Sequence, residues 1–215
     1  MDEDPRKILM IGDSHMREMD HYAMKEFETL DTIMFSVGDK IPTIRNLFQL
    51  RLATITEFNP DKTILHVGHN ELAVDPVRNP SPSLSIPVAL DTISFANYIQ
   101  IYLPHTQIYV SSPFPRSHTF QSSMTESQII QYNMVAKRHG QRIRTRSKEV
   151  GLQFFLNNVM WRTISKAKEE ETYYLRDGLH LNPQGKKAVV KEWVTTMYPE
   201  LADQSDPDEP NDDLN

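Results

Sequence analysis

The chain of 215 residues contains no cysteine, which excludes a disulfide framework and thiol chemistry. No apolar run approaches the roughly 20 residues that a helix needs to cross a bilayer. The first residues, Met1-Asp2-Glu3-Asp4-Pro5, are acidic and unlike a signal peptide. We therefore expect a cytoplasmic protein, and a targeting segment in a longer protein containing this chain would change that expectation.

The chain also lacks an excess of positive charge, since its formal net charge is -6. This balance argues against attraction of nucleic acid to the whole surface, but it is compatible with a local basic patch. The densest basic stretch spans 137–148 and contains Lys137, Arg138, His139, Arg142, Arg144, Arg146 and Lys148. One interpretation is the solvated end of a helix, where cations favour the C-terminal dipole. The other is a patch that binds a membrane surface or RNA.

Length and composition indicate one ordinary globular domain. Hydrophobic residues make up 39% and charged residues 24% of the chain, and 215 residues are enough to bury a substantial core. The segment 202–215 is almost wholly polar and acidic and contains no internal apolar pattern. We predict a folded domain over 1–201 and an acidic disordered tail over 202–215.

Short apolar runs alternate with helical patterns along the domain. Strands are predicted at 7–11, 32–36, 62–67, 106–110 and 151–155, and helices near 16–28, 43–58, 88–103, 125–148 and 184–198. This alternation predicts an α/β fold with a parallel sheet covered on both faces. In such a sheet, active sites gather outside the carboxyl ends of the strands. The segment 71–87, rich in proline and serine, is predicted to be a long loop beside that site, without an apolar lid.

A serine follows the first predicted strand, in Gly12-Asp13-Ser14, and Asp177-Gly178-Leu179-His180 lies near the other end of the chain. A serine hydroxyl needs a base to take its proton, and the base needs a group that orients it. Asp177 and His180 are three residues apart, so one loop can present a carboxylate to one imidazole nitrogen and leave the other for Ser14. Each piece also has an ordinary interpretation, since Gly-Asp-Ser is a common turn and Asp-x-x-His a common local pair.

A third block, Gly68-His69-Asn70-Glu71, follows the third predicted strand. Asn70 at this edge can aim its amide N–H groups at an oxyanion. Its ordinary interpretation is a turn residue that tolerates a left-handed conformation. His66 and His69 suggest a metal, but His66 lies in an apolar strand and no third ligand stands at useful spacing. We therefore predict no metal and no cofactor.

Together these blocks resemble the SGNH (GDSL-type) hydrolase family. The resemblance covers Gly12-Asp13-Ser14, Gly38 in Ser36-Val37-Gly38-Asp39, Gly68-His69-Asn70-Glu71 and Asp177-Gly178-Leu179-His180, in the family's order. It implies a three-layer α/β/α (flavodoxin-like) fold whose five-stranded parallel sheet has the order 2-1-3-4-5. It also implies a catalytic triad of Ser14, His180 and Asp177, with oxyanion donors from Ser14, Gly38 and Asn70.

The chain departs from the family at two positions. Glu71 stands where the family usually has aspartate, and Glu18 stands where it often has glycine. Two blocks are more similar to the esterase domains in the first reading frame of LINE-type retrotransposons than to the bacterial lipase branch of the family. These blocks are Ile11-Gly12-Asp13-Ser14-His15 and Val67-Gly68-His69-Asn70-Glu71.

The predicted function is a serine esterase that hydrolyses short-chain, acetyl-type carboxylic esters through an acyl-enzyme on Ser14. The substrate is then a small-molecule or lipid ester. The alternative is a lipid- or RNA-associating module on the same fold, part of a retrotransposon-encoded particle, which uses the basic stretch 137–148.

Overall fold

The computed structural model describes residues 5–73, 82–117, 124–164 and 173–204. Its centre is a parallel sheet of five strands in the order β2-β1-β3-β4-β5. The strands are β1 (Arg6–Gly12), β2 (Leu30–Ser36), β3 (Lys62–His66), β4 (Gln107–Ser111) and β5 (Gln153–Phe155). This order is the predicted one, and every strand begins or ends within two residues of its predicted bounds.

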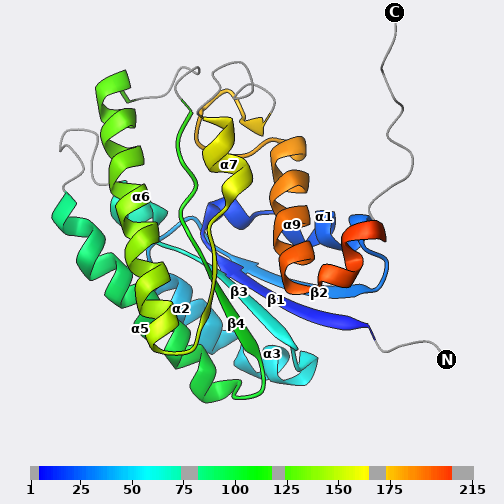
Figure 1. The fold of residues 1–215 in the computed structure, drawn as a ribbon. Coiled ribbons are helices and arrows are strands. Elements are labelled where there is room, and N and C mark those ends of the chain that lie inside the picture. Colours follow the sequence, from blue (N-terminus) through cyan, green and yellow to red (C-terminus); the bar gives the residue numbers. More distant parts are fainter. Residues whose placement is uncertain (1–4, 74–81, 118–123, 165–172, 205–215) are drawn as a thin grey trace, which may run out of the picture.

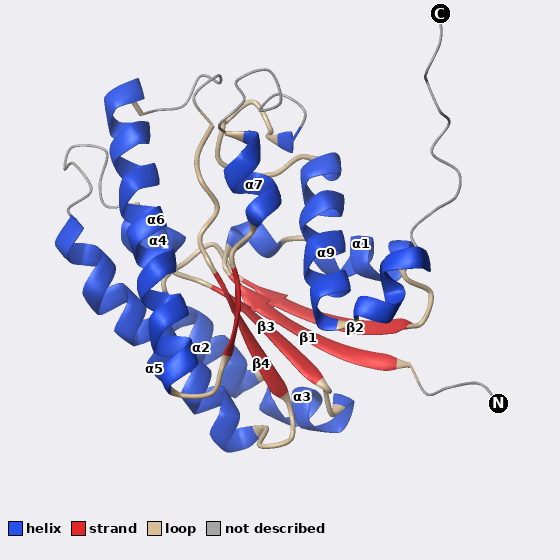
Figure 2. Ribbon diagram, viewed as in Figure 1, coloured by secondary structure: helices blue, strands red, loops and turns tan. Residues whose placement is uncertain are grey.

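Helices cover both faces of the sheet, as the alternating sequence pattern predicts (Figures 1 and 2). One face is covered by α2 (Ile41–Leu50), α3 (Leu52–Phe58), α5 (Ser85–Tyr102) and α6 (Glu126–Glu149). The other is covered by α1 (Met19–Glu26), α7 (Asn158–Thr163) and α9 (Pro183–Met197). The remaining described helices are η1 (Ser14–Met16), α4 (His69–Leu72), η2 (Pro82–Leu84) and η3 (Pro199–Gln204).

The first strand shows why the sheet needs two helical layers. Successive side chains of a strand point to opposite faces. Leu9 and Ile11 belong to the core under α2, α5 and α6, while Ile8 and Met10 belong to the core under α1 and α9. All four side chains are at most 1% exposed. A continuous apolar run is therefore typical of a central parallel strand, and the α/β/α prediction is confirmed.

The structure differs from the sequence prediction in several elements. The helix at 43–58 is two helices, α2 and α3, because Arg51 leaves helical geometry at φ -102 and ψ 3. No glycine or proline marks the break, and the buried stripe of Ile44, Phe48 and Ile55 runs on across it. Helix α7 was not predicted. The predicted acidic tail starts too early, since 202–204 are part of η3, and its remainder lies outside the described residues.

The predicted loop at 71–87 is also shorter than expected. Glu71 and Leu72 belong to α4, and helical structure resumes at Pro82 and continues into α5 at Ser85. The segment 74–81 between them lies outside the described residues. The described ends of this segment are thus anchored in helices, α4 before it and η2 after it.

Candidate active site

Ser14 lies at the carboxyl edge of the sheet, directly beyond β1. Asp13 caps the short helix η1 by accepting a hydrogen bond from the backbone N–H of His15 at 3.1 Å. The preceding Gly12 lets the turn approach β3 closely, because a Cβ there would lie 2.4 Å from both the His66 carbonyl oxygen and Met16 Cγ. The glycine of the Gly-Asp-Ser block is therefore required by packing, and it leaves Ser14 half-buried at the sheet edge.

The structure brings Ser14, His180 and Asp177 into one hydrogen-bonded chain. Ser14 Oγ lies 3.1 Å from His180 Nε2, and His180 Nδ1 lies 2.7 Å from Asp177 Oδ2. With the Nδ1 proton directed at the carboxylate, Nε2 is the acceptor for the serine hydroxyl. This is the geometry of an activated serine nucleophile.

The loop that carries Asp177 and His180 is tied together by its own backbone. Asp177 Oδ1 accepts hydrogen bonds from the N–H groups of Leu179 and His180, each at 2.9 Å. Gly178 between them adopts φ 64, a conformation that favours glycine. Partial burial alone would raise the pKa of Asp177, but the His180 ring and these N–H groups outweigh it and lower that pKa. The carboxylate therefore stays ionised beside the imidazole.

The other two predicted oxyanion donors lie at the same edge, Gly38 in the turn after β2 and Asn70 in α4. A Cβ added to Gly38, just beyond β2, would lie 3.7 Å from Ser14 Cβ, so Gly38 is adjacent to the serine. Asn70 Nδ2 donates a 2.8 Å hydrogen bond to the carbonyl of Asp39, which follows Gly38. A side-chain amide has two N–H groups, and this bond uses one. Glu71 accepts a bond from the backbone N–H of Ile41 and so also holds this loop against α4.

A buried histidine network behind Ser14 was missed by the sequence analysis. Asp13 Oδ1 lies 2.8 Å from His15 Nδ1, and Asp13 Oδ2 lies 3.0 Å from His69 Nδ1. His69 Nε2 accepts from the Phe114 backbone N–H at 2.7 Å, which assigns the His69 proton to Nδ1. The His15 ring stacks on His69 at 4.0 Å and on His180 at 5.2 Å between centroids. Asp13 and His15 flank Ser14 in the sequence, and this arrangement was the signal from which the network could have been predicted.

The electrostatics of the network follow from burial. Burial alone would raise the pKa of Asp13, but the His69 and His15 imidazoles outweigh it and hold that pKa well below its ordinary value. Burial lowers the pKa of His69 to about 4 and that of His66 well below its ordinary value. At neutral pH the network thus has an ionised carboxylate and neutral imidazoles at His66 and His69.

The structure supplies the third potential metal ligand that the spacing did not show. Ligand atoms of Asp13, His66 and His69 lie within 4.8 Å of one another. As described, both His69 nitrogens are used in hydrogen bonds, and His66 Nδ1 lies 2.8 Å from Ser111 Oγ. The arrangement is that of a hydrogen-bond network, and the absence of a metal requirement stays a prediction. His66 itself is fully buried, as expected for a core histidine.

A cavity of about 320 Å³ lies beside the triad. Its lining residues come from η1 and the residue after it, from the segment 175–181 and from α9. They are Ser14, His15, Arg17, Leu175, His180, Leu181 and Lys186. A second, larger cavity of about 610 Å³ lies over α5 and α6. Only the smaller one reaches the serine.

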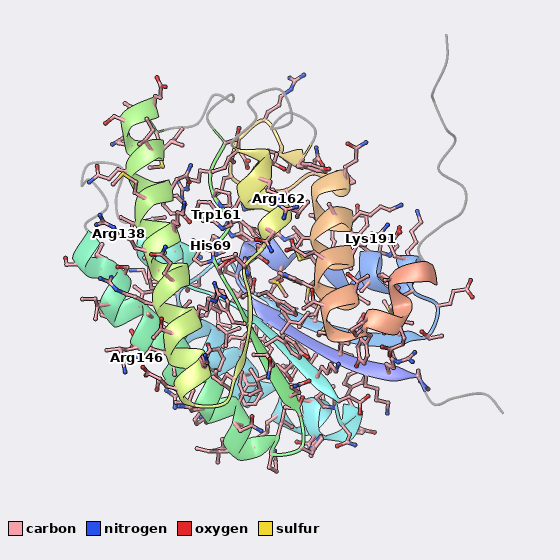
Figure 3. All side chains as sticks on the ribbon, viewed as in Figure 1. His69, Arg138, Arg146, Trp161, Arg162 and Lys191 are labelled. Carbon is pink, nitrogen blue, oxygen red and sulfur yellow. The ribbon has the colours of Figure 1, made fainter. Side chains whose placement is uncertain are left out.

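The basic stretch 137–148 lies on α6, where Figure 3 labels Arg138 and Arg146, with His69 apart from them near the sheet edge. Three of its residues, Arg138, Arg142 and Arg146, line the larger cavity beside the half-exposed Ile86 and Leu90. His139 is fully buried, so it does not belong to a basic surface. The helical period turns it toward the core, where burial lowers its pKa to about 4.

No protein-family model and no curated protein matches this sequence. The fold is similar to solved structures. One is a putative GDSL-like lipase from Parabacteroides merdae, 16% identical, with a TM-score of 0.65 over 89% of this chain and 95% of that one. Another is the lipase/acylhydrolase from Enterococcus faecalis, 15% identical, with a TM-score of 0.61 over 94% and 98%. A catalytic mutant of Axe2, an acetylxylan esterase from Geobacillus stearothermophilus, is 11% identical, with a TM-score of 0.62 over 92% and 97%.

These similarities show that the chain has the SGNH hydrolase fold. At such low identity they show the fold alone, and the chemistry must be argued from the site.

Proposed function

We propose that this chain is a serine esterase that hydrolyses short-chain carboxylic esters through an acyl-enzyme on Ser14. The observation that carries the proposal is the continuous chain of hydrogen bonds from Ser14 to His180 to Asp177. Its place at the carboxyl edge of an SGNH hydrolase fold supports the same conclusion, because ligands bind at this edge in open α/β sheets.

In the proposed mechanism His180 acts first as a base and then as an acid. Its Nε2 takes the Ser14 proton while Oγ attacks the ester carbonyl carbon, and the same proton then passes to the leaving alcohol. In the second half, His180 takes a proton from water, the hydroxide attacks the acyl carbon, and the proton returns to Ser14 Oγ as the acid leaves. Asp177 holds the imidazole tautomer throughout.

The oxyanion of each tetrahedral intermediate needs hydrogen-bond donors. The proposed donors are the backbone N–H groups of Ser14 and Gly38 and the side-chain amide of Asn70. Their support is the position of Gly38 next to Ser14 and the bond that ties Asn70 to Asp39. Donors fixed in place before the reaction are typically the largest catalytic contribution in such sites.

The proposed substrates carry a short, acetyl-type acyl group. The cavity beside Ser14 has a volume of about 320 Å³, near the lower end of the roughly 300–1,000 Å³ typical of ligand pockets. Five of its seven lining side chains are polar or charged, which suits a small ester better than a long acyl chain.

Replacement of the nucleophile tests the proposal. Ser14→Ala should reduce hydrolysis of 4-nitrophenyl acetate by about 10⁶-fold, the loss seen when a triad nucleophile is removed. Covalent labelling by a fluorophosphonate probe should disappear with the same substitution. Ser94→Ala, on the exposed face of α5, is the matched control and should keep both signals. Undiminished hydrolysis by folded Ser14→Ala protein would reject Ser14 as the nucleophile.

A second candidate function is attachment to an anionic lipid surface through α6. The observation that favours it is the groove in which Arg138 and Arg142 lie beside Ile86 and Leu90, since apolar side chains among arginines suit a bilayer better than RNA. Arg146 also lines the groove, but it is paired with Glu149 at 2.8 Å. Flotation with phosphatidylserine vesicles and with phosphatidylcholine vesicles tests it. Binding to neither vesicle, or equal binding to RNA and anionic vesicles, would count against this candidate.

Two finer assignments also belong to the proposal. Membership of the LINE-type retrotransposon branch is the first, and it rests on the amino-acid sequences of two short blocks, around Ser14 and Asn70. A cytoplasmic location is the second of these assignments and stays a proposal. No helix among the described residues is long and apolar enough to span a bilayer.

A further inference from the structure

The cavity beside the triad has an unusual charge for this protein. The chain as a whole has 29 acidic and 23 basic residues apart from histidine. Yet the part of its lining that the structure describes contains two cations, Arg17 and Lys186, and no carboxylate. Both cations therefore lie at the space that leads to Ser14 and His180.

Arg17 is the unengaged member of this pair. Its side chain is exposed, and its guanidinium makes no hydrogen bond or ion pair with any residue in the described ranges. The residue follows η1 directly, and its backbone N–H is bonded to the Ser14 carbonyl at 3.3 Å. The guanidinium is thus attached to the same short turn that carries Ser14, and its N–H groups are available to a ligand.

Lys186 approaches the cavity from α9 and is held in place. Its side chain is only 13% exposed, and its Nζ lies 2.7 Å from Glu18 Oε2. A largely buried ammonium that lines a cavity is positioned by this pair rather than free in solvent. Because Glu18 neutralises much of its charge, Lys186 contributes less net attraction than Arg17.

The backbone of Glu18 gives independent support. It adopts φ 67 and ψ 6, the left-handed region, which is unfavourable for a residue other than glycine. Glycine would fit without strain but would leave Lys186 without its partner. The strained residue therefore carries the side chain that positions a cation at the cavity, and strain of this kind clusters at functional sites.

We propose that this cavity binds a carboxylate or phosphate on the alcohol part of the ester, so that the enzyme selects anionic substrates. The inference rests on the proposed esterase function and adds the charge of the substrate. A short acyl group leaves no place for the charge on the acyl side, which assigns it to the alcohol. The side chain of Leu175, 44% exposed at the cavity, offers an apolar contact for the carbon skeleton between ester and anion.

Three acetyl esters of para-substituted phenols test the proposal. They are 4-acetoxybenzoate, 4-acetoxyphenyl phosphate and the neutral 4-acetoxybenzamide. The wild-type protein should prefer the two anions in kcat/KM, mainly through a lower KM. Arg17→Gln should reduce the preference for 4-acetoxybenzoate over 4-acetoxybenzamide by about tenfold, as expected for the loss of one charged hydrogen bond. A larger effect with the phosphate would identify phosphate as the preferred anion.

A substitution in the Glu18–Lys186 pair should change the preference for the anionic ester in the opposite direction. Glu18→Gln removes the counter-charge of Lys186 and should increase the preference for the anionic ester. Lys187→Gln is the matched control, because Lys187 is the next residue on α9, pairs with Glu26 at 3.2 Å and does not line the cavity. This control changes the net charge as Arg17→Gln does and should leave the preference unaltered.

The outcomes separate this inference from the proposed function. Equal preference in wild-type and Arg17→Gln protein, or an equal change in Lys187→Gln, would overturn the anion site while esterase activity stands. If the wild-type protein cleaves none of the three esters, the proposed function fails. Calorimetric titration of 4-acetoxybenzoate and 4-acetoxybenzamide into Ser14→Ala protein, with and without Arg17→Gln, then still decides the binding claim. Equal binding of both compounds would reject it.

Discussion

The hydrogen-bond network behind Ser14 allows a quantitative prediction for Asp13→Asn. The Asp13 side chain is 1% exposed and accepts three hydrogen bonds, from the His15 backbone N–H, His15 Nδ1 and His69 Nδ1. The substitution preserves the shape of the side chain. It removes the negative charge and turns one acceptor oxygen into a donor NH₂ group.

The cost follows from which partners can adapt. His69 cannot become an acceptor at Nδ1, because its Nε2 already accepts the Phe114 N–H. The asparagine oxygen must therefore face His69, and its NH₂ group faces His15. His15 can move its proton to Nε2, but its backbone N–H then loses its acceptor. One lost bond in a buried site and the loss of a charged partner for His69 together cost about 2–4 kcal/mol.

Urea unfolding at pH 7 measures this cost as the difference in unfolding free energy between wild-type and Asp13→Asn protein. Asp91→Asn, on the exposed face of α5, is the matched control and should change stability by less than about 0.5 kcal/mol. The pKa of Asp13 is depressed in the folded state, so its contribution is complete above the ordinary aspartate pKa of about 4 and is lost as pH falls through the folded value. The difference should therefore be constant between pH 8 and pH 5.

Two results would refute this reasoning. A variant as stable as the wild type at pH 7 would mean that Asp13 is not the charged centre of the network. A difference that disappears between pH 8 and pH 5 would mean that histidine protonation, rather than the carboxylate, dominates the site.

Three further predictions concern catalysis, substrate and pH. Asn70→Ala should lower turnover by roughly 10²–10³ with little change in KM, as for the loss of an oxyanion donor; full turnover with a lowered melting temperature would leave Asn70 as a turn residue. Acetyl and butyryl esters should be cleaved faster than palmitoyl esters in a chain-length series, and a preference for palmitoyl would reveal an apolar groove. Burial lowers the pKa values of His66, His69 and His139, so unfolded protein binds more protons below about pH 6.5 and the unfolding free energy should fall on acidification. Denaturant titrations from pH 7 to 5 measure that fall, and a flat profile would contradict the neutral buried imidazoles.

Sequence patterns alone were enough to predict the layers of the fold and the edge of the sheet that carries the candidate site. A buried parallel strand must be apolar on both faces, so the run through Ile8 and Ile11 was sufficient to locate β1. Ser14, Gly38 and Asn70 each follow a strand, and parallel strands end at one edge. The proximity of these residues could therefore be predicted without coordinates. The position of the Asp177–His180 loop came from the family resemblance, since no periodicity links positions 14 and 180.

The partners of the histidines and the charge of the cavity beside Ser14 could not be predicted in this way, because they depend on tertiary packing. His15 and His69 share Asp13 although they lie 54 residues apart, and hydrogen bonds between distant residues leave no periodic pattern in a sequence. His139 belongs to a basic stretch by composition but to the core by its helical phase. Arg17 and Lys186 meet at one cavity because α9 packs beside α1 at the edge that carries Ser14. Such meetings depend on how the helices pack, and packing depends on the side chains of all elements at once.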